Sequence, residues 1–189
     1  MADAIVDLIH HASRLRFEQP LDAYRLYADA VRRSRQAGLP RELIKALKGL
    51  GQIERDLKNG EAALPHYEEA VSLCRQQGDA LLLAHTVRHV GDIHQDAGRD
   101  QLAETCYQEA LSIYRHHAQA NPLDLANAVR PLALLKENAG EVDEARRLWA
   151  EARDLYAASN VPQGVAESSR RLARLSAVPR DHIDSLKRH

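Results

Sequence analysis

Three side chains near the middle of the chain have the spacing of a metal site. His85, His89 and Asp92 follow one another at intervals of four and three residues, so in a helix they share one face. Two histidines at i and i+4 can bind a divalent metal, and a carboxylate can complete the ligand set. The segment lacks an HExxH sequence, and a polar helix face explains the same residues. We expect no cofactor, and keep a metal- or small-ligand-dependent sensor or enzyme as an alternative hypothesis.

Other catalytic arrangements are missing from the sequence. No GxSxG motif places a serine in a tight turn, and the nine glycines are scattered rather than gathered in a phosphate-binding loop. Cys74 and Cys106 are far apart and outside any CxxC motif, which is typical of cysteines that pack as small hydrophobic residues. The sequence therefore predicts a protein that is not an enzyme.

The composition restricts the fold class and the partners. Alanine (30 residues) and leucine (26) dominate, whereas aromatic residues make up 4%. Strands favour β-branched and aromatic residues, so this composition predicts an all-α fold. A net charge of −1 argues against general nucleic-acid binding. The chain lacks a secretory signal and any apolar run of about 18 residues, so we expect no membrane span and a cytoplasmic location.

The sequence contains a repeat of about 40 residues. In the segments 51–71, 91–111 and 133–153, a small residue is followed by alanine, then by a large aromatic residue, then by alanine again. These positions are Gly51, Gly91 and Ala133; Ala63, Ala103 and Ala145; Tyr67, Tyr107 and Trp149; and Ala70, Ala110 and Ala152. The last alanine also occurs at position 30, which gives spacings of 40, 40 and 42 residues.

Each repeat predicts two helices with a breaker between them. Apolar residues recur at helical spacing in the first half, and Pro40, Pro122 and Pro162 stand where a first helical turn is expected. Small residues let two helices approach closely, and the aromatic side chain fills the next gap in the core. We expect residues 1–176 to form one solenoid of about four helix pairs plus a terminal helix, followed by a polar tail at 177–189.

The small, alanine, aromatic and alanine positions of each unit are called slots below. They resemble the slots of the tetratricopeptide repeat, which pairs two antiparallel helices in a unit of about 34 residues. The longer unit found here is similar to the variants in kinesin light chains and cortical-polarity scaffolds. The resemblance implies a right-handed superhelical solenoid whose concave groove binds another protein.

The resemblance also implies which residues line that groove. In the family, side chains at fixed offsets from the small residue of each first helix point into it. The corresponding set here is Lys45, Lys48, Gln52, Arg55, His85, Arg88, His89, Asp92, Gln95, Asn127, Arg130, Arg170, Arg171 and Arg174. One offset gives a basic residue in each of four successive units, a column formed by Lys48, Arg88, Arg130 and Arg170.

The basic column leads to the main functional hypothesis. Neighbouring cations repel one another until an acidic partner binds, and arginine can hold a carboxylate through two hydrogen bonds. We therefore expect a non-catalytic scaffold that holds an acidic peptide or helix of another protein. Reversing Arg88 and Arg130 should abolish binding without unfolding the chain, because exposed helix charges contribute less than about 0.5 kcal/mol to stability.

Two further interpretations stay open. Long charged side chains can simply solvate a helix face, with Arg88 paired to Asp92 four residues later. A self-associating module, and with it a homo-oligomer, would instead pack an exposed apolar end on another copy. The carboxylate clamp of chaperone-binding family members is not reproduced, since Gln52 and His89 replace its asparagines. A chaperone tail is therefore not the expected partner.

Overall fold

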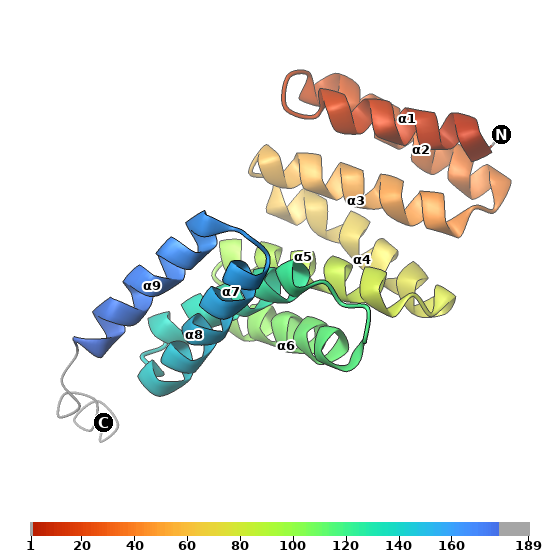
Figure 1. Cartoon of the computed structure of the whole chain (residues 1–189). Helices are drawn as coiled ribbons and strands as arrows, with labels where there is room; N and C mark the ends of the chain where they lie inside the picture. The colour runs from red at the N-terminus through yellow and green to blue at the C-terminus, as the bar shows by residue number, and fades with distance from the viewer. Residues whose placement is uncertain (1, 178–189) are drawn as a thin grey trace. The chain divides into compact units, whose positions relative to one another are not determined.

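A computed structural model describes residues 2–177, and all regular secondary structure within them is α-helical. The helices are α1 (Ala2–Leu15), α2 (Pro20–Ala37), α3 (Pro40–Asp56), α4 (Gly60–Gln77), α5 (Ala80–Asp96), α6 (Asp100–His116), α7 (Pro122–Asn138), α8 (Val142–Ala158) and α9 (Pro162–Ser176) (Figure 1). The predicted all-α class is confirmed. Of the predicted polar tail, residues 178–189 lie outside the described part. Within residues 2–177, no helix combines the length and apolar character that crossing a membrane requires.

The helix boundaries follow the predicted breakers. The first turns of α3, α7 and α9 contain Pro40, Pro122 and Pro162. A backbone N–H group in a first turn has no intrahelical acceptor, so proline, which lacks this group, is tolerated there. Gly38 ends α2 with a left-handed φ of 64°, a conformation that glycine adopts without a steric penalty. Short connections of this kind return the chain at once, so successive helices within each unit pack as antiparallel neighbours (Figure 1).

The chain divides into two compact units, Met1–Ile113 and Tyr114–His189, with the boundary inside α6. In the first unit α1 packs on α2, α3 packs on α4, and α2 and α4 also contact the first helix of the following pair. In the second unit α8 packs against both α7 and α9. Antiparallel helix pairs, as predicted, are therefore the building blocks of both units.

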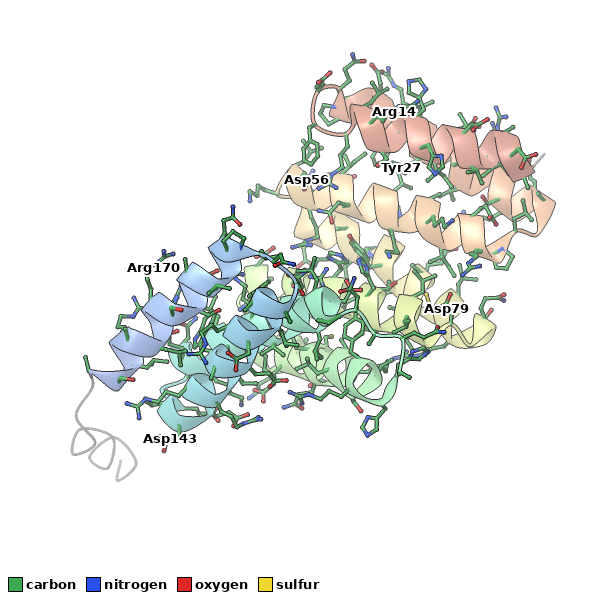
Figure 2. The ribbon with its side chains drawn as sticks, viewed as in Figure 1. Arg14, Tyr27, Asp56, Asp79, Asp143 and Arg170 are labelled. Atoms are coloured by element: carbon green, nitrogen blue, oxygen red, sulfur yellow. The ribbon has the colours of Figure 1, made fainter. Side chains whose placement is uncertain are left out.

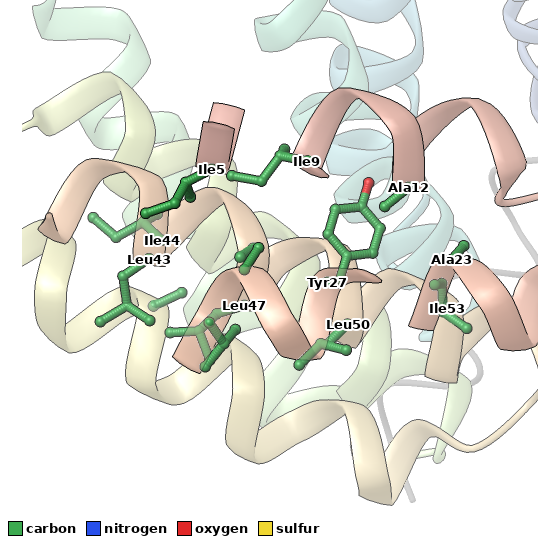
Figure 3. Packing of buried hydrophobic residues seen from close by; sticks show 14 of the residues in the cluster. Ile5, Ile9, Ala12, Ala23, Tyr27, Leu43, Ile44, Leu47, Leu50 and Ile53 are labelled. Atoms are coloured by element: carbon green, nitrogen blue, oxygen red, sulfur yellow. The ribbon is translucent and has the colours of Figure 1, made fainter. Parts of the chain in front are cut away.

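The core of the first unit consists of interlocking aliphatic and aromatic side chains. Figure 3 shows Ile5 and Ile9 of α1 close to Tyr27 of α2 and Leu47 of α3, within one buried cluster. A second cluster surrounds Tyr67 of α4 and includes valines and an isoleucine of α5. These aliphatic contacts fix the helix pairs and so determine which side of each first helix faces away from its partner.

The predicted pairing of small and aromatic residues is confirmed as core packing. A Cβ atom on Gly51 would lie 2.6 Å from the Tyr67 ring, and one on Gly91 would lie 2.7 Å from the Tyr107 ring. Both tyrosines are buried, as is Trp149 in the second unit. The aromatic residues are therefore packing elements rather than a ligand cage.

Candidate functional site

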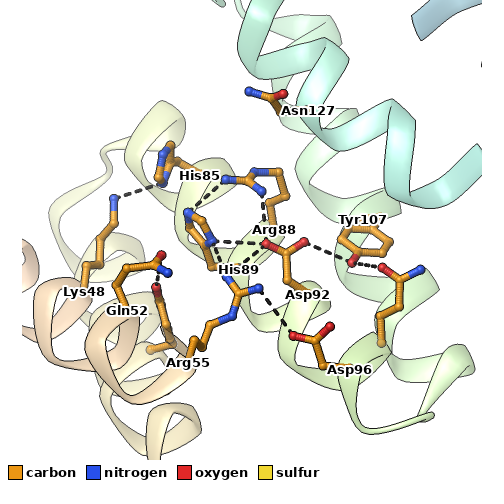
Figure 4. Close-up of polar contacts among 12 residues, drawn as sticks. Lys48, Gln52, Arg55, His85, Arg88, His89, Asp92, Asp96, Tyr107 and Asn127 are labelled. Carbon is orange, nitrogen blue, oxygen red and sulfur yellow. Dashed lines mark hydrogen bonds and ion pairs between the residues drawn. The ribbon is translucent and has the colours of Figure 1, made fainter. Parts of the chain in front are cut away.

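The first helices α3 and α5 of the first unit bring predicted groove residues into contact (Figure 4). The set comprises Lys48, Gln52 and Arg55 of α3, and His85, Arg88, His89, Asp92 and Gln95 of α5. Residues three or four positions apart share a helix face, so each helix contributes one row. The two rows meet between residues 37 apart, with Lys48 bonded to His85 and Arg55 bonded to Asp92. Lys45, in the same row of α3, is exposed.

Asp92 is the centre of this polar network. Its Oδ2 atom accepts hydrogen bonds from Arg88 Nη1 at 3.1 Å and Arg55 Nη1 at 3.3 Å, and its Oδ1 atom accepts one from the Tyr107 hydroxyl at 3.1 Å. Burial alone would raise the pKa of this carboxyl group, but the His89 hydrogen bond and the neighbouring guanidinium charges hold the pKa below its ordinary value. The ionised carboxylate therefore holds two cations in place.

The contacts of His89 determine its tautomer. Arg88 Nη2 lies 2.9 Å from His89 Nε2, and a guanidinium can only donate, so Nε2 carries the lone pair. The proton is then on Nδ1, which donates to Asp92 Oδ2 at 3.2 Å. Arg55 Nη1 also lies 3.1 Å from Nδ1, but two N–H groups face each other there and form no hydrogen bond. Burial and the charges of Arg88 and Arg55 lower the pKa of His89 to about 4, so the ring is neutral at pH 7.

His85 is fixed in the opposite tautomer. The ammonium group of Lys48 lies 3.0 Å from His85 Nδ1 and can only donate, so Nδ1 accepts and the proton is on Nε2. Burial, followed by the Lys48 charge, lowers the pKa of His85 to about 2. The neutral ring therefore presents an N–H donor beside the lysine.

These two buried neutral histidines predict that acid destabilises the chain. An unfolded histidine binds a proton near pH 6.5, whereas the folded pKa values of His85 and His89 are about 2 and about 4. The unfolded state therefore binds more protons as the pH falls from 7.5 to 5, and each ring should remove roughly 2 kcal/mol of stability over that range. We expect His85→Gln to decrease this acid-induced loss by about that amount, as measured by urea denaturation at both pH values.

The control for this measurement is His10→Gln, at an exposed position on α1. Its acid-induced loss of stability should equal that of the wild type. If His85→Gln loses as much stability on acidification as the wild type does, His85 is not a buried neutral group.

The metal-site hypothesis receives no support from the geometry. Within residues 2–177, no group of three or more histidine, cysteine or acidic side chains is arranged to hold a metal ion. His85 Nδ1 and His89 Nε2, the two unprotonated ring atoms, each accept from a cation, and Asp92 is bonded to arginine. The geometry therefore does not favour His85, His89 and Asp92 as a metal site, because these ligand atoms already have protein donors.

In the second unit, α7 and α9 supply Asn127, Arg130, Arg170, Arg171 and Arg174. Arg130 binds Glu167 of α9 through two hydrogen bonds of 2.8 Å, again between residues 37 apart. The Tyr156 hydroxyl donates to Asn127 Oδ1 at 3.1 Å, so this predicted groove residue serves to anchor a core aromatic side chain.

Glu137 forms a second acidic centre in this unit. Its carboxylate accepts hydrogen bonds from Trp149 Nε1 at 2.9 Å, from Arg171 Nη1 at 3.2 Å and from Arg174 Nη2 at 2.5 Å. Burial would raise the pKa of Glu137, but these three donors together hold it below its ordinary value. The Arg171 guanidinium also lies 5.5 Å from the centre of the Trp149 ring, which orients it further.

The predicted basic column is partly neutralised within each unit. Arg88 is paired with Asp92, and Arg130 is paired with a glutamate of α9. The Arg88 side chain is only 14% exposed, so the charge reversal expected to spare the fold would fall on a half-buried, paired side chain rather than on an exposed one. Lys45 and Arg170, by contrast, are exposed. These two positions are therefore better suited to contact a partner.

The sequence interpretation missed the residues that complete these networks. Tyr107 had been assigned to the core alone, but its hydroxyl also donates to Asp92 and Gln95. Glu137 and Glu167 were not recognised as partners of the arginines. The usable signal is the spacing of 37 residues, one helical turn short of the 40-residue repeat, which places side chains of successive first helices opposite each other.

Comparison with known proteins agrees with the repeat. Residues 42–116 match a family model described as tetratricopeptide repeat. No curated protein matches the sequence significantly. The matched region includes α4 and α5 in full and most of α3, and so contains the polar network of the first unit.

Several solved structures are similar in fold. BtubC (BKLC) from P. vanneervenii has 17% identity and a TM-score of 0.64, with 93% of this chain and 89% of that chain covered. The Rap protein complexed with competence and sporulation factor has 17% identity and a TM-score of 0.79, with 92% of this chain and 52% of that chain covered. A Podosopora anserina protein described as a kinesin light chain with TPR-like repeats has 16% identity and a TM-score of 0.75, with 97% and 91% covered.

Proposed function

Because this chain is a tetratricopeptide-repeat protein, we propose that it is a non-catalytic scaffold that binds an acidic segment of another protein on the face of its first helices. Repeats of this type are protein-interaction modules and are generally non-enzymatic. The observation that carries the proposal is that this face presents exposed cations, Lys45 in the first unit and Arg170 in the second. A carboxylate arriving there meets donors.

In the first unit these donors lie toward one end of the face. Lys45 is exposed, and Lys48 lies beside the Nε2–H group of the neutral His85 ring. Two acidic groups of the same face, Asp92 and Asp96, lie at its other end. Both are paired with arginine, Asp92 with Arg55 and Arg88, and Asp96 with Arg55. This distribution supports an acidic partner that binds near the exposed Lys45 rather than near Arg55 and Arg88.

A solved relative supports the same kind of role. The Rap protein, whose structure resembles this chain, was obtained in complex with competence and sporulation factor. That complex is a property of Rap, of which this chain spans about half the length. For this chain it supports the general proposal that helix pairs of this type hold another molecule.

The proposal predicts that Lys45→Glu weakens binding of acidic peptides about tenfold, equivalent to ~1.4 kcal/mol. Peptides selected from a random display library on the purified chain should be enriched in Asp and Glu. Their affinity, measured by fluorescence anisotropy, should fall in the variant and should also fall as salt is raised, because screening shortens to about 8 Å at physiological ionic strength.

Arg25→Glu is the matched control for this measurement. Arg25 is on the second helix α2, its side chain is 77% exposed, and the substitution changes the net charge equally. Its effect on affinity should stay below about twofold. Selected peptides without acidic enrichment, or equal effects of the Lys45 and Arg25 substitutions, would contradict the proposal.

A further inference from the structure

One face of α9 lines a hollow of about 600 Å³. It is lined by Gln163, Glu167, Arg170, Arg171 and Arg174. Their spacing along the helix places all five on one side of α9, where Figure 2 labels Arg170. Three guanidinium groups therefore surround one space that is open to solvent and lies within the second unit.

The charges around this hollow do not balance. The described groups on and beside it are the guanidinium groups of Arg130, Arg170, Arg171 and Arg174 and the carboxylates of Glu137 and Glu167. Glu167 is held by Arg130 through two hydrogen bonds, and Glu137 is held by Arg171 and Arg174. With the Arg130–Glu167 pair set aside, the three arginines of α9 face the single carboxylate of Glu137, which leaves an excess of two positive charges.

We propose that this hollow is an anion site that binds a phosphate monoester, carried by a phosphorylated side chain of the partner segment. The partner segment itself rests on the proposed function. A phosphate monoester carries a charge of about −1.5 to −2 at pH 7 and three acceptor oxygens, which matches the excess of two positive charges. A single carboxylate would neutralise only half of it.

The arginines are held in place before any ligand arrives. Arg171 is fixed by its bond to Glu137 and by its position over the Trp149 ring, and Arg174 is fixed by the same carboxylate. Ordering side chains on binding costs conformational entropy, and this cost is largely avoided for both. Arg170 is exposed as well, and among residues 2–177 it forms no ion pair that closing on the ligand would break.

The experiment is an NMR titration of the ¹⁵N-labelled full chain with inorganic phosphate, with O-phosphoserine and with a phosphoserine peptide. Acetate and the matching glutamate peptide serve as carboxylate probes. We expect the phosphate probes to shift amide signals of α9 and its contacts in α7 and α8, and to bind about tenfold more tightly than the carboxylate probes. The phosphate probes should also weaken about tenfold between pH 7.5 and pH 5, because the second phosphate pKa is about 6.

The protein groups that face the hollow keep their charge over that range. The four arginines of α7 and α9 stay protonated. The pKa of Glu167 is lowered by its hydrogen bond to Arg130, and the pKa of Glu137 is held low by Arg174, Arg171 and Trp149 despite burial. A change of affinity between pH 7.5 and pH 5 therefore reports the protonation of the ligand.

Arg170→Glu should weaken O-phosphoserine binding at least about tenfold, and Arg170→Lys should restore part of the affinity. The matched control is Arg153→Glu on α8, whose side chain is 43% exposed and pairs with the adjacent Asp154. It should change the affinity less than about twofold. Circular dichroism of each variant verifies that the helices are retained.

Three results would overturn the inference. They are the absence of α9 shifts with every phosphate probe, equal affinity for acetate and phosphate without a pH effect, and binding of inorganic phosphate without binding of the phosphoserine peptide. Failure of the scaffold proposal is distinguishable, because it would show as loss of the Lys45-dependent peptide binding in the first unit while small phosphate probes still bind α9.

Discussion

Replacing Tyr107 with alanine is expected to lower the free energy of unfolding by about 3–5 kcal/mol, the range observed when a large aromatic core side chain is removed. Tyr107 is fully buried, and its ring fills the space that the missing side chain of Gly91 leaves open. The substitution would leave a cavity between α5 and α6 and remove the hydroxyl that bonds to Asp92 and Gln95. Urea denaturation followed by far-UV circular dichroism measures the change.

Two further variants separate the ring from the hydroxyl group. Tyr107→Phe keeps the ring and loses hydrogen bonds of 3.1 Å to Asp92 and 2.9 Å to Gln95, so it should cost about 1–2 kcal/mol. Gln108→Ala, at the neighbouring exposed position of α6, should change stability by less than about 0.5 kcal/mol. An unfolding midpoint of Tyr107→Ala equal to that of Gln108→Ala would show that the slot does not hold the helix pair together.

The Tyr107 slot also explains why the fold could be predicted from the sequence. A glycine opposite a tyrosine ring leaves room for one arrangement only, since a Cβ on Gly51 or Gly91 would overlap the ring. Steric constraints of this kind recur at fixed spacing and are readable without a structure. Together with prolines at helix starts, they determine the helix pairs and their boundaries.

The ion pairs followed less directly from the sequence. Long charged side chains have several rotamers, and alternative exposed ion pairs differ in free energy by fractions of a kcal/mol. The sequence of a helix face with mixed charges therefore does not show which side chains pair. The arginines were therefore interpreted as a basic column, although Asp92 and Glu167 neutralise two of its members. The buried environment that determines the histidine tautomers likewise depends on packing between α3 and α5.

Some of this pairing does have a regular spacing. Arg35 bonds to Glu69, and Arg75 bonds to Glu109, both between second helices of the first unit and both 34 residues apart. The Arg55–Asp92 and Arg130–Glu167 contacts between first helices join residues 37 apart. Both values fall short of the 40-residue repeat by three or six residues, so they follow from the repeat period once helix register is taken into account.

Replacing Asp92 with alanine should be nearly as damaging as removing Tyr107, at about 3 kcal/mol. Removing one partner of a buried ion pair costs about 3–5 kcal/mol because the other charge is left without a partner. Here the side chains of Arg55 and Arg88 are 19% and 14% exposed, so water replaces part of the lost interaction. The same substitution removes an acceptor of the Tyr107 hydroxyl. Urea denaturation at pH 7 measures the loss.

The pH dependence of this loss identifies the carboxylate as its source. The folded pKa of Asp92 is held below the unfolded value, because the His89 hydrogen bond and the arginine charges outweigh the effect of burial. The stabilisation is therefore complete above about pH 4 and disappears as the pH falls through the folded pKa. The difference between wild type and Asp92→Asn should be constant from pH 7 to pH 5 and shrink below pH 4.

Asp96→Ala provides the matched comparison on the same helix. Asp96 also pairs with Arg55, at 3.5 Å, but its side chain is 71% exposed. Exposed pairs contribute about 0–1 kcal/mol, so this variant should lose far less stability than Asp92→Ala. Equal losses in the two variants would mean that Asp92 is one more solvated charge. A larger, pH-dependent loss at Asp92 would instead show that its arginines are bound within the fold, which leaves contact with an acidic partner to the exposed cations of this face.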